Sequence, residues 1–194
     1  MIPVATDAVT LIEQDHRAME ALFDQVQAGK GDRVALVAEI TARLTAHARA
    51  EEQEVYPALE QADPAEQDEV EHAYVEHHEA EHLLRKARNL TASPHFDVAF
   101  TAFVAAVKHH VDEEESDVLP ALREAVDDTT LRTLGEAFER VRADLLSERV
   151  AIVDGATRDQ LYEMAKNAGI AGRSSMNKQE LAEALQTTDD PALP

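Results

Sequence analysis

Two copies of the spacing His-x-x-x-Glu are the residues of this sequence best placed to do chemistry. The first copy is His47 and Glu51, and the second is His110 and Glu114. Residues four apart lie one above the other on the same face of an α-helix. Each pair also continues the apolar seam of its own segment: Ile40 and Leu44, and Phe103 and Val107. The seams predict that both pairs point into the protein interior.

The two copies belong to a longer internal repeat. Segments 47–59 and 110–122 share His, two Glu, Val, Pro, Ala and Leu at identical offsets. Segments 15–23 and 76–84 also match, and they contribute His16 and His77. The chain is therefore predicted to form two similar helical hairpins, related by an approximate two-fold axis.

Together the repeat places four imidazoles and two carboxylates in one interior. Buried unpaired charges are costly, and a metal ion supplies both a counter-charge and acceptors for the lone pairs. Mixed imidazole and carboxylate ligation suits iron, manganese or zinc. The two-fold repeat favours a pair of ions bridged by the two glutamates. The predicted ligands are His16, His47, Glu51, His77, His110 and Glu114.

Some neighbouring residues are candidates to act beside these ligands. Glu20 and Glu81 occupy equivalent repeat positions one turn from a ligand histidine, where they either orient the imidazoles or are merely solvated. Tyr56 is a candidate hydrogen-bond donor to the site, with simple packing as the alternative. Pro57 and Pro120 each follow a ligand glutamate by six residues and predict a kink or a helix end.

The other histidines are weaker candidates. His82 is a candidate fifth histidine ligand, because His78-x-x-x-His82 places two imidazoles one turn apart. However, His77, and not His78, aligns with the first repeat and lies on the apolar seam. The rest are predicted to be surface residues: His72, His95 and His109.

Long helices must position these residues. Ala, Glu and Leu are the commonest of the 194 residues, and there are only 6 Gly and 7 Pro. Apolar periodicity predicts helices over 7–28, 32–61, 64–90, 93–125 and 129–150. We therefore expect an all-α protein, with an up-down-up-down four-helix bundle over 1–126 and an additional packing helix and linker over 127–154. The predicted helix starts are Asp7, Asp63-Pro64 and Ser93-Pro94.

The charge changes near residue 154. Residues 1–154 carry 14 basic and 33 acidic side chains, whereas residues 155–186 carry four of each. Region 155–186 is predicted to be a separate helix–extended–helix module, and 187–194 a disordered tail. The net charge of -21 argues against a nucleic-acid partner for the bundle. With four basic residues, the module is expected to bind nucleic acid weakly at most.

Composition excludes several other classes. Without cysteine the chain has no disulfide, thiolate metal site or cysteine nucleophile. No apolar run approaches the ~20 residues that a membrane-spanning helix needs. The first residues lack the basic patch and apolar core of a secretory signal, which predicts a cytoplasmic protein.

The ligand pattern His16 … His47-x-x-x-Glu51 … His77 … His110-x-x-x-Glu114 resembles the hemerythrin-like, or HHE, cation-binding domain. The Glu-Glu-x-x-x-x-Pro continuations and the opening Glu-His-His-Glu of the third helix are also typical of that family. The resemblance covers about residues 7–126. It implies a four-helix bundle that holds two iron ions in an oxo- or hydroxo-bridged, non-haem di-iron centre, with the six residues above as ligands.

The sequence departs from the oxygen-carrying members of that family. They use His-x-x-x-His on the third helix and an Asp five residues after the last histidine, whereas this chain offers Glu114 at the fourth position. The resemblance therefore implies the bacterial and regulatory branch, associated with H2O2, O2, NO or iron responses and with oxidative stress. Catalase-like peroxide disproportionation is the preferred chemistry. A non-enzymatic sensor or iron-binding protein is the alternative.

Two further patterns bear on the architecture. Residues 157–185 resemble the N-terminal helix–extended–helix module of transcription terminator Rho, akin to SAP modules, which are often associated with nucleic acids. A protein contact and a plain structural role are alternatives of at least equal weight here. A competing ferritin-like di-iron site is suggested by three Glu-x-x-His spacings that do not recur in the repeat: Glu13 to His16, Glu69 to His72 and Glu79 to His82.

Overall fold

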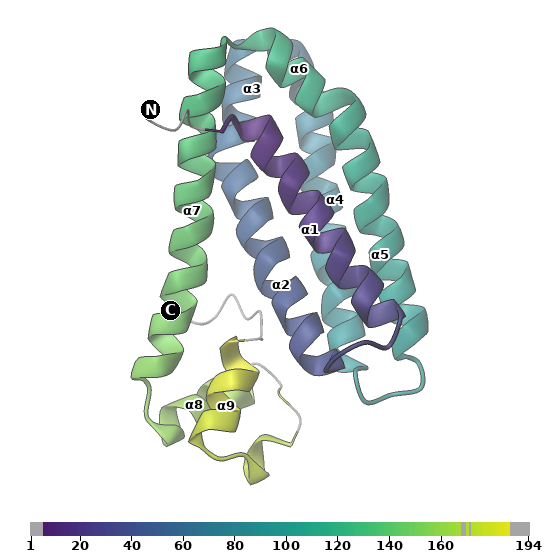
Figure 1. Ribbon diagram of the computed structural model, residues 1–194, viewed down its shortest axis with the longest axis vertical. Coiled ribbons are helices and arrows are strands. Elements are labelled where there is room, and N and C mark those ends of the chain that lie inside the picture. Colours follow the sequence, from purple (N-terminus) through teal and green to yellow (C-terminus); the bar gives the residue numbers. More distant parts are fainter. Residues whose placement is uncertain (1–5, 168–169, 171, 187–194) are drawn as a thin grey trace.

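Antiparallel helices form the body of the protein in a computed structural model that describes residues 6–167, 170 and 172–186 (Figure 1). Helix α1 spans Ala8–Gln27, α2 Arg33–Ala50, α3 Tyr56–Ala62, α4 Gln67–Asn89, α5 Phe96–Glu113 and α6 Leu119–Ala125. Helices α2 and α3 form one rod and α5 and α6 another, so that four rods alternate in direction as the sequence predicts. No strand occurs in the described residues, which confirms the all-α class.

Side-chain caps start the helices close to where the sequence places them. Asp7 accepts a hydrogen bond from the Thr10 amide at 3.0 Å and caps α1. Asp63 caps a short 3₁₀ turn, Pro64–Glu66, that leads into α4. The start predicted at Ser93-Pro94 is early, because the chain first makes a turn there and α5 begins at Phe96.

Both ligand-bearing rods widen into π-helix where their glutamates lie. The π-helical segments are Glu51–Val55 and Glu114–Val118, each beginning at a predicted ligand. A proline ring in a regular α-helix clashes with the carbonyl four residues earlier. The wider turn before Pro57 and Pro120 relieves that clash, and the rods continue instead of ending. The predicted helix ends therefore do not occur at the prolines, and the π turns fall at the site, as such turns often do.

The bundle core has two apolar parts with a polar layer between them. One part includes Phe23, Phe100 and Phe103, and the other includes Ile12, Leu59 and Phe138. On three of the rods a predicted ligand histidine separates the residues of the two parts, and on the rod of α5 and α6, where Val111 belongs to the first part, Glu114 separates them. Two well-packed apolar clusters thus fix the four rods on both sides of the polar layer.

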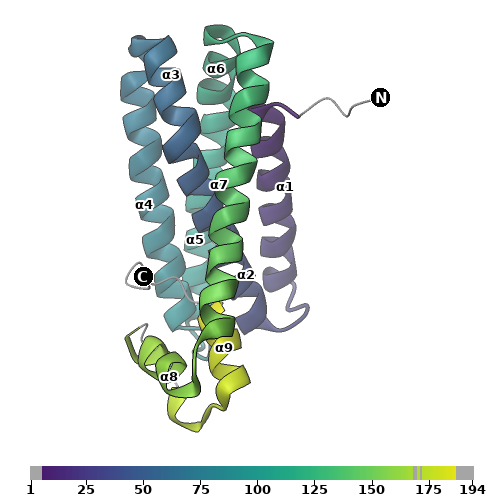
Figure 2. The same cartoon turned by 90° about the vertical axis from the view of Figure 1, so that its left-hand side faces the viewer.

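Helix α7, Asp128–Gly155, packs along α1 and α2 (Figure 2). It buries Leu131 and Phe138 against the bundle. A β-carbon on Gly135 would lie 2.4 Å from the backbone oxygen of Thr6, so a glycine is required for this close approach. The helix runs through the residues predicted as a linker.

The described residues between Ala156 and Gln186 form a small helical module beside the C-terminal end of α7 (Figure 1). It consists of α8, Arg158–Asn167, a 3₁₀ turn, Arg173–Ser175, and α9, Lys178–Gln186. Thr157 and Gln160 form a reciprocal capping box that starts α8. The module has its own core: Ala156, Leu161, Ala165, Leu181 and Leu185. The tail predicted over 187–194 lies outside the described residues. Within the described part, no helix has the length and apolar character to cross a membrane.

Candidate metal centre

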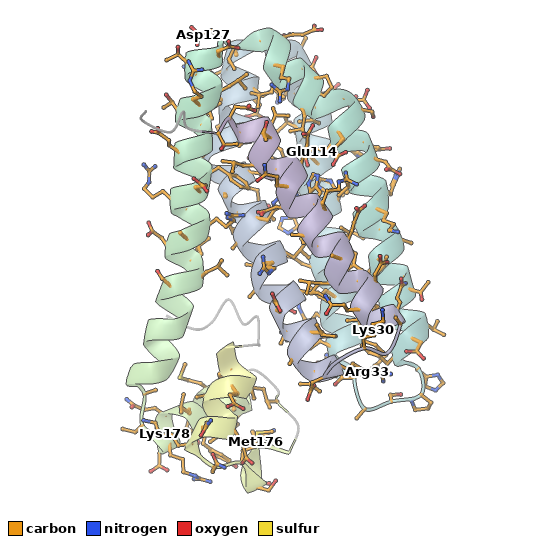
Figure 3. The ribbon with its side chains drawn as sticks, viewed as in Figure 1. Lys30, Arg33, Glu114, Asp127, Met176 and Lys178 are labelled. Atoms are coloured by element: carbon orange, nitrogen blue, oxygen red, sulfur yellow. The ribbon has the colours of Figure 1, made fainter. Side chains whose placement is uncertain are left out.

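The polar layer of the bundle consists of the six residues that the sequence predicts as ligands. All six are buried, with at most 6% of any residue exposed: His16, His47, Glu51, His77, His110 and Glu114. They come from α1, α2, α4, α5 and the two π-helical turns. Figure 3 shows Glu114 part-way along the bundle, well away from Met176 and Lys178 of the C-terminal module.

Within this layer, Glu51 joins two groups of possible ligand atoms. His16, His47, Glu51 and Glu114 form one group, and Glu51, His77 and His110 form the other; the atoms of each lie within 4.8 Å of one another. Glu51 Oε1 lies 3.0 Å from His47 Nε2, and its Oε2 lies 3.4 Å from His77 Nε2. One carboxylate therefore faces both halves, as a bridging ligand requires.

Glu114 is placed less symmetrically. Its Oε2 lies 3.2 Å from His16 Nε2 and 3.8 Å from His110 Nε2. Its Oε1 accepts a hydrogen bond from the Tyr56 hydroxyl at 3.1 Å. Glu114 thus offers one oxygen to the histidines of both halves and holds the other toward Tyr56.

The donor set fits metal ions because several buried atoms have no other partner. Five atoms of the layer are buried and make no hydrogen bond: His16 Nε2, His47 Nε2, both carboxylate oxygens of Glu51, and Glu114 Oε2. Leaving buried polar atoms unsatisfied costs roughly 1–3 kcal/mol each. Imidazole nitrogens and carboxylate oxygens that converge in a buried layer are suitable ligands for a first-row metal ion.

A second ring of carboxylates surrounds the histidines. Each ligand imidazole has a carboxylate oxygen beside its Nδ1, at 2.8 Å for His16, 3.4 Å for His47, 3.2 Å for His77 and 2.9 Å for His110. The carboxylates are, in the same order, Glu115, Asp15, Glu52 and Glu76. A carboxylate that holds the Nδ1 hydrogen turns the Nε2 lone pair toward the centre.

The predicted orienting residues are therefore wrong. Glu20 instead pairs with Arg17 at 2.9 Å, and Glu81 lies 4.0 Å from Arg49. Glu20 and Glu81 share a helical face with His16 and His77, but they form their ion pairs with other residues. The neighbouring helix supplies the carboxylate instead. The repeat contained the signal, since Asp15 aligns with Glu76, and Glu52 with Glu115.

Tyr56 lies inside the site, as the sequence suggests, but the other half has no tyrosine at the equivalent position. Its ring stacks on His77 with a centroid separation of 5.6 Å, and its hydroxyl is 3.4 Å from His77 Nε2. The repeat places Leu119 at the equivalent position, also buried. Burial and the nearby carboxylates raise the pKa of Tyr56 well above its ordinary value, so the phenol keeps its proton.

Charge balance in the protein without metal depends on protons. Burial lowers the pKa of His47, but Glu51 and Asp15 outweigh it and raise the pKa to about 10. Burial also lowers the pKa of His77, but Glu51 and Glu52 outweigh it and raise that pKa to about 9. Burial raises the pKa of Glu51, and the two histidines lower it strongly. The protons on these imidazoles occupy the places that metal ions would take.

The remaining sequence candidates lie outside the layer. His82 is exposed, and the side chain of His78 is 68% exposed, so neither contributes a fifth imidazole. The ferritin-like alternative is not supported, because its glutamates and two of its histidines are exposed: Glu13, Glu69, Glu79, His72 and His82. Exposure also agrees with the surface prediction for His72, His95 and His109.

This fold and donor set define a helical-bundle metal-binding protein. The family model of the hemerythrin HHE cation-binding domain matches residues 7–122, and the chain belongs to that family. The N-terminal domain of Rho termination factor matches residues 157–186, which confirms the resemblance of the C-terminal module.

Comparison with solved structures supports the fold. A crystal structure of a hemerythrin HHE cation-binding domain-containing protein from Mycobacterium kansasii superposes with a TM-score of 0.67 and 23% sequence identity. The match covers 77% of this chain and 93% of that one. No protein with a curated description matches the sequence significantly.

Proposed function

We propose that the protein holds two iron ions in the polar layer and disproportionates hydrogen peroxide to water and dioxygen. The observation that carries the proposal is the set of buried, unpartnered donor atoms arranged around Glu51, which faces both pairs of histidines. Two irons that cycle between ferrous and ferric states supply the electron transfer that this reaction needs.

The residues of the chain have three tasks in this proposal. The six ligands hold the ions, and the outer carboxylates fix the imidazole rings. The Tyr56 hydroxyl fixes Glu114 Oε1 and keeps a proton beside the centre, within reach of a bound oxidant. Apolar residues of the two core clusters exclude water above and below the layer.

Iron analysis, a visible spectrum and oxygen release on adding peroxide test the proposal. We expect two irons per chain in the purified protein and a burst of oxygen. His47→Ala is expected to lose the iron and the oxygen release. His82→Ala changes an exposed histidine of the same bundle and is expected to keep the iron and the oxygen release. Iron-free protein, or iron-loaded protein that releases no oxygen, would overturn the catalytic proposal.

A second candidate is a non-enzymatic sensor of O2, NO or iron. The observation in its favour is that α9 of the C-terminal module contacts α7 and α2, and α2 carries His47. Iron binding without oxygen release favours this candidate. Partner binding that changes with iron content and disappears on deletion of 155–194 would establish it. A mobility-shift assay on the same deletion tests whether that partner is a nucleic acid.

A further inference from the structure

A second group of metal-ligating side chains lies outside the polar layer, on the surface of α4 and α5. His72, Glu76 and Glu113 place one ligand atom each within 4.8 Å of the others. His72 Nε2 lies 3.3 Å from Glu113 Oε2 and 3.7 Å from Glu76 Oε1. We call these three residues the outer cluster. His109 adds a second imidazole, 3.3 Å from Glu113.

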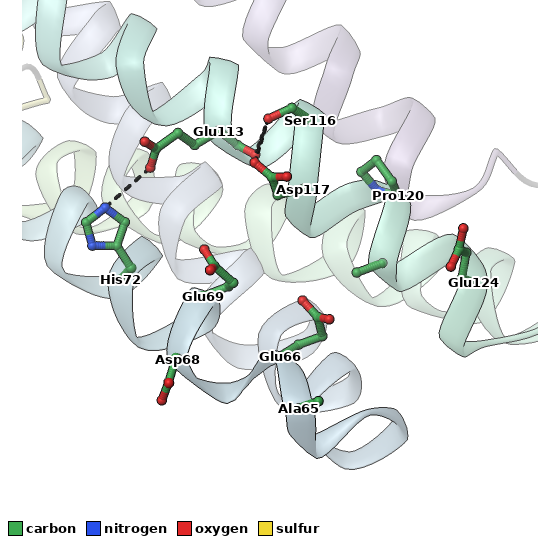
Figure 4. Close-up of a pocket in the computed structure, with 11 residues that line it drawn as sticks. Ala65, Glu66, Asp68, Glu69, His72, Glu113, Ser116, Asp117, Pro120 and Glu124 are labelled. Atoms are coloured by element: carbon green, nitrogen blue, oxygen red, sulfur yellow. Dashed lines mark hydrogen bonds and ion pairs between the residues drawn. The ribbon is translucent and has the colours of Figure 1, made fainter.

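Two residues of the outer cluster, His72 and Glu113, line one side of an acidic depression of about 780 Å³ (Figure 4). Among the residues that line this depression are six carboxylates and neither lysine nor arginine: Glu66, Asp68, Glu69, Glu113, Asp117 and Glu124. Concave surfaces lined by one sign of charge concentrate counter-ions and raise their rate of association. The depression therefore attracts cations.

Residues of the outer cluster and of the buried centre line one small cavity together. A small cavity of about 10 Å³, enough for one water-sized probe, is lined by His72, Glu76 and Glu113 and also by His110 and Glu114 of the centre. The side chain of Glu114 is fully buried, and its Oε2 makes no hydrogen bond. An unsatisfied carboxylate oxygen thus belongs to a residue in the wall of the cavity that the outer cluster lines.

Glu76 connects the two groups directly. Its Oε2 lies 2.9 Å from Nδ1 of the ligand His110, while its Oε1 faces His72. An ion at the outer cluster therefore lies one side chain from the polar layer.

The internal repeat provides a built-in comparison for these positions. In the other half, the residues equivalent to His72, Glu113, Glu69 and His109 are Leu11, Ala50, Ala8 and Ala46, all buried. The bundle fold is thus compatible with apolar side chains at every one of these positions. His72 and Glu113 therefore have potential ligand atoms only in the half that α7 leaves uncovered, whereas Glu76 has the equivalent carboxylate Asp15 in the other half.

We propose that His72, Glu76 and Glu113 form a binding site for a divalent first-row transition-metal cation, from which the ion passes to the buried centre. Imidazole and carboxylate are suitable ligands, and three of them at an open surface leave coordination positions for water. A site of this kind binds weakly and exchanges its ion quickly. The passage to the centre rests on the proposed function, whereas the outer site does not.

Stopped-flow loading of metal-free protein with Co²⁺, followed by its visible spectrum, tests the passage. The test variant is His72→Ala/Glu113→Gln. The matched control is His78→Ala/Glu79→Gln, which makes the same changes at exposed positions on α4. We expect the test variant to load about tenfold more slowly than wild type at low ionic strength, and the control to stay within about twofold. Added salt is expected to slow wild type toward the test variant. Equal rates for the two variants would overturn the passage.

Equilibrium titration tests the outer site separately. In a His47→Ala/Glu51→Ala background, which disables the buried centre, we expect one weakly bound Co²⁺ that disappears when His72→Ala/Glu113→Gln is added. Circular dichroism checks that each variant is folded. If the background binds no Co²⁺ that depends on His72 and Glu113, the outer site is wrong. If wild type takes up no metal in its centre while this single ion persists, the proposed function fails and the outer site stands.

Discussion

The two halves of the bundle have matching ligands and unlike surroundings. In the half formed by α1 and α2, Arg142 of α7 forms an ion pair with Asp15, the carboxylate behind His47. In the half formed by α4 and α5, the equivalent Glu76 lies beside His110 and faces the exposed imidazoles of His72 and His109. One half is covered by a helix and the other is open to solvent.

The comparison distinguishes the residues that recur in both halves from those that occur in only one of them. The six ligands and the four outer carboxylates recur in both hairpins, as a symmetric pair of ions requires. Arg142, Tyr56 and the outer cluster each occur once. We infer that the covered half is the rigid side of the centre, and that the open half exchanges ions and solvent.

The largest effect is expected where the halves meet. Glu51→Ala removes the one carboxylate whose two oxygens face the two pairs of histidines, so both ions should be lost. Metal analysis of purified protein measures the loss, with His82→Ala as the control. Retention of both ions would show that Glu51 does not bridge the halves.

Smaller effects are expected from the carboxylates behind the histidines. Asp15→Asn and Glu76→Gln should each weaken iron binding about 10–100-fold, as loss of a ligand's orienting partner does elsewhere. Asp15→Asn also leaves the Arg142 guanidinium without its carboxylate, so it should lower the melting temperature more than Glu76→Gln. Chelator competition and thermal unfolding measure the two effects. Equal destabilisation by both variants would contradict the rigid covered half.

The smallest effect is expected on the stability of the metal-free protein as pH rises, and it comes from one histidine of each half. The raised pKa values mean that protonated His47 and His77 stabilise the fold fully below their ordinary value of 6.5. This contribution is lost as pH increases through about 9 for His77 and about 10 for His47. NMR titration should show both imidazoles keeping their protons well above pH 6.5, with stability declining as the protons are lost. Loss of both protons near pH 6.5 would contradict this electrostatic account.

Local patterns predicted the fold and the burial of the six candidate ligands, because both rest on helical periodicity. The seam that placed His77 inside also placed His78 and His82 outside, as the structure shows. The π turns were not predicted, although the six-residue spacing from each ligand glutamate to proline was visible. Their geometry depends on a steric clash that hydrophobic periodicity does not describe.

Contacts between distant segments were not predicted from the sequence. The carboxylate behind each histidine comes from another helix, so the positions one turn along the same helix gave the wrong partners. Arg142 and Asp15 are 127 positions apart, and no local pattern relates them. The outer cluster is also a tertiary feature, since His72 and Glu113 meet only because α4 and α5 pack antiparallel.

Anomalous diffraction at the iron edge, from crystals of the iron-loaded protein, tests the central claim most directly. We predict two iron peaks in the polar layer, one beside His16 and His47 and the other beside His77 and His110, with Glu51 between them. A single peak, or no peak within these six residues, would contradict the two-ion centre.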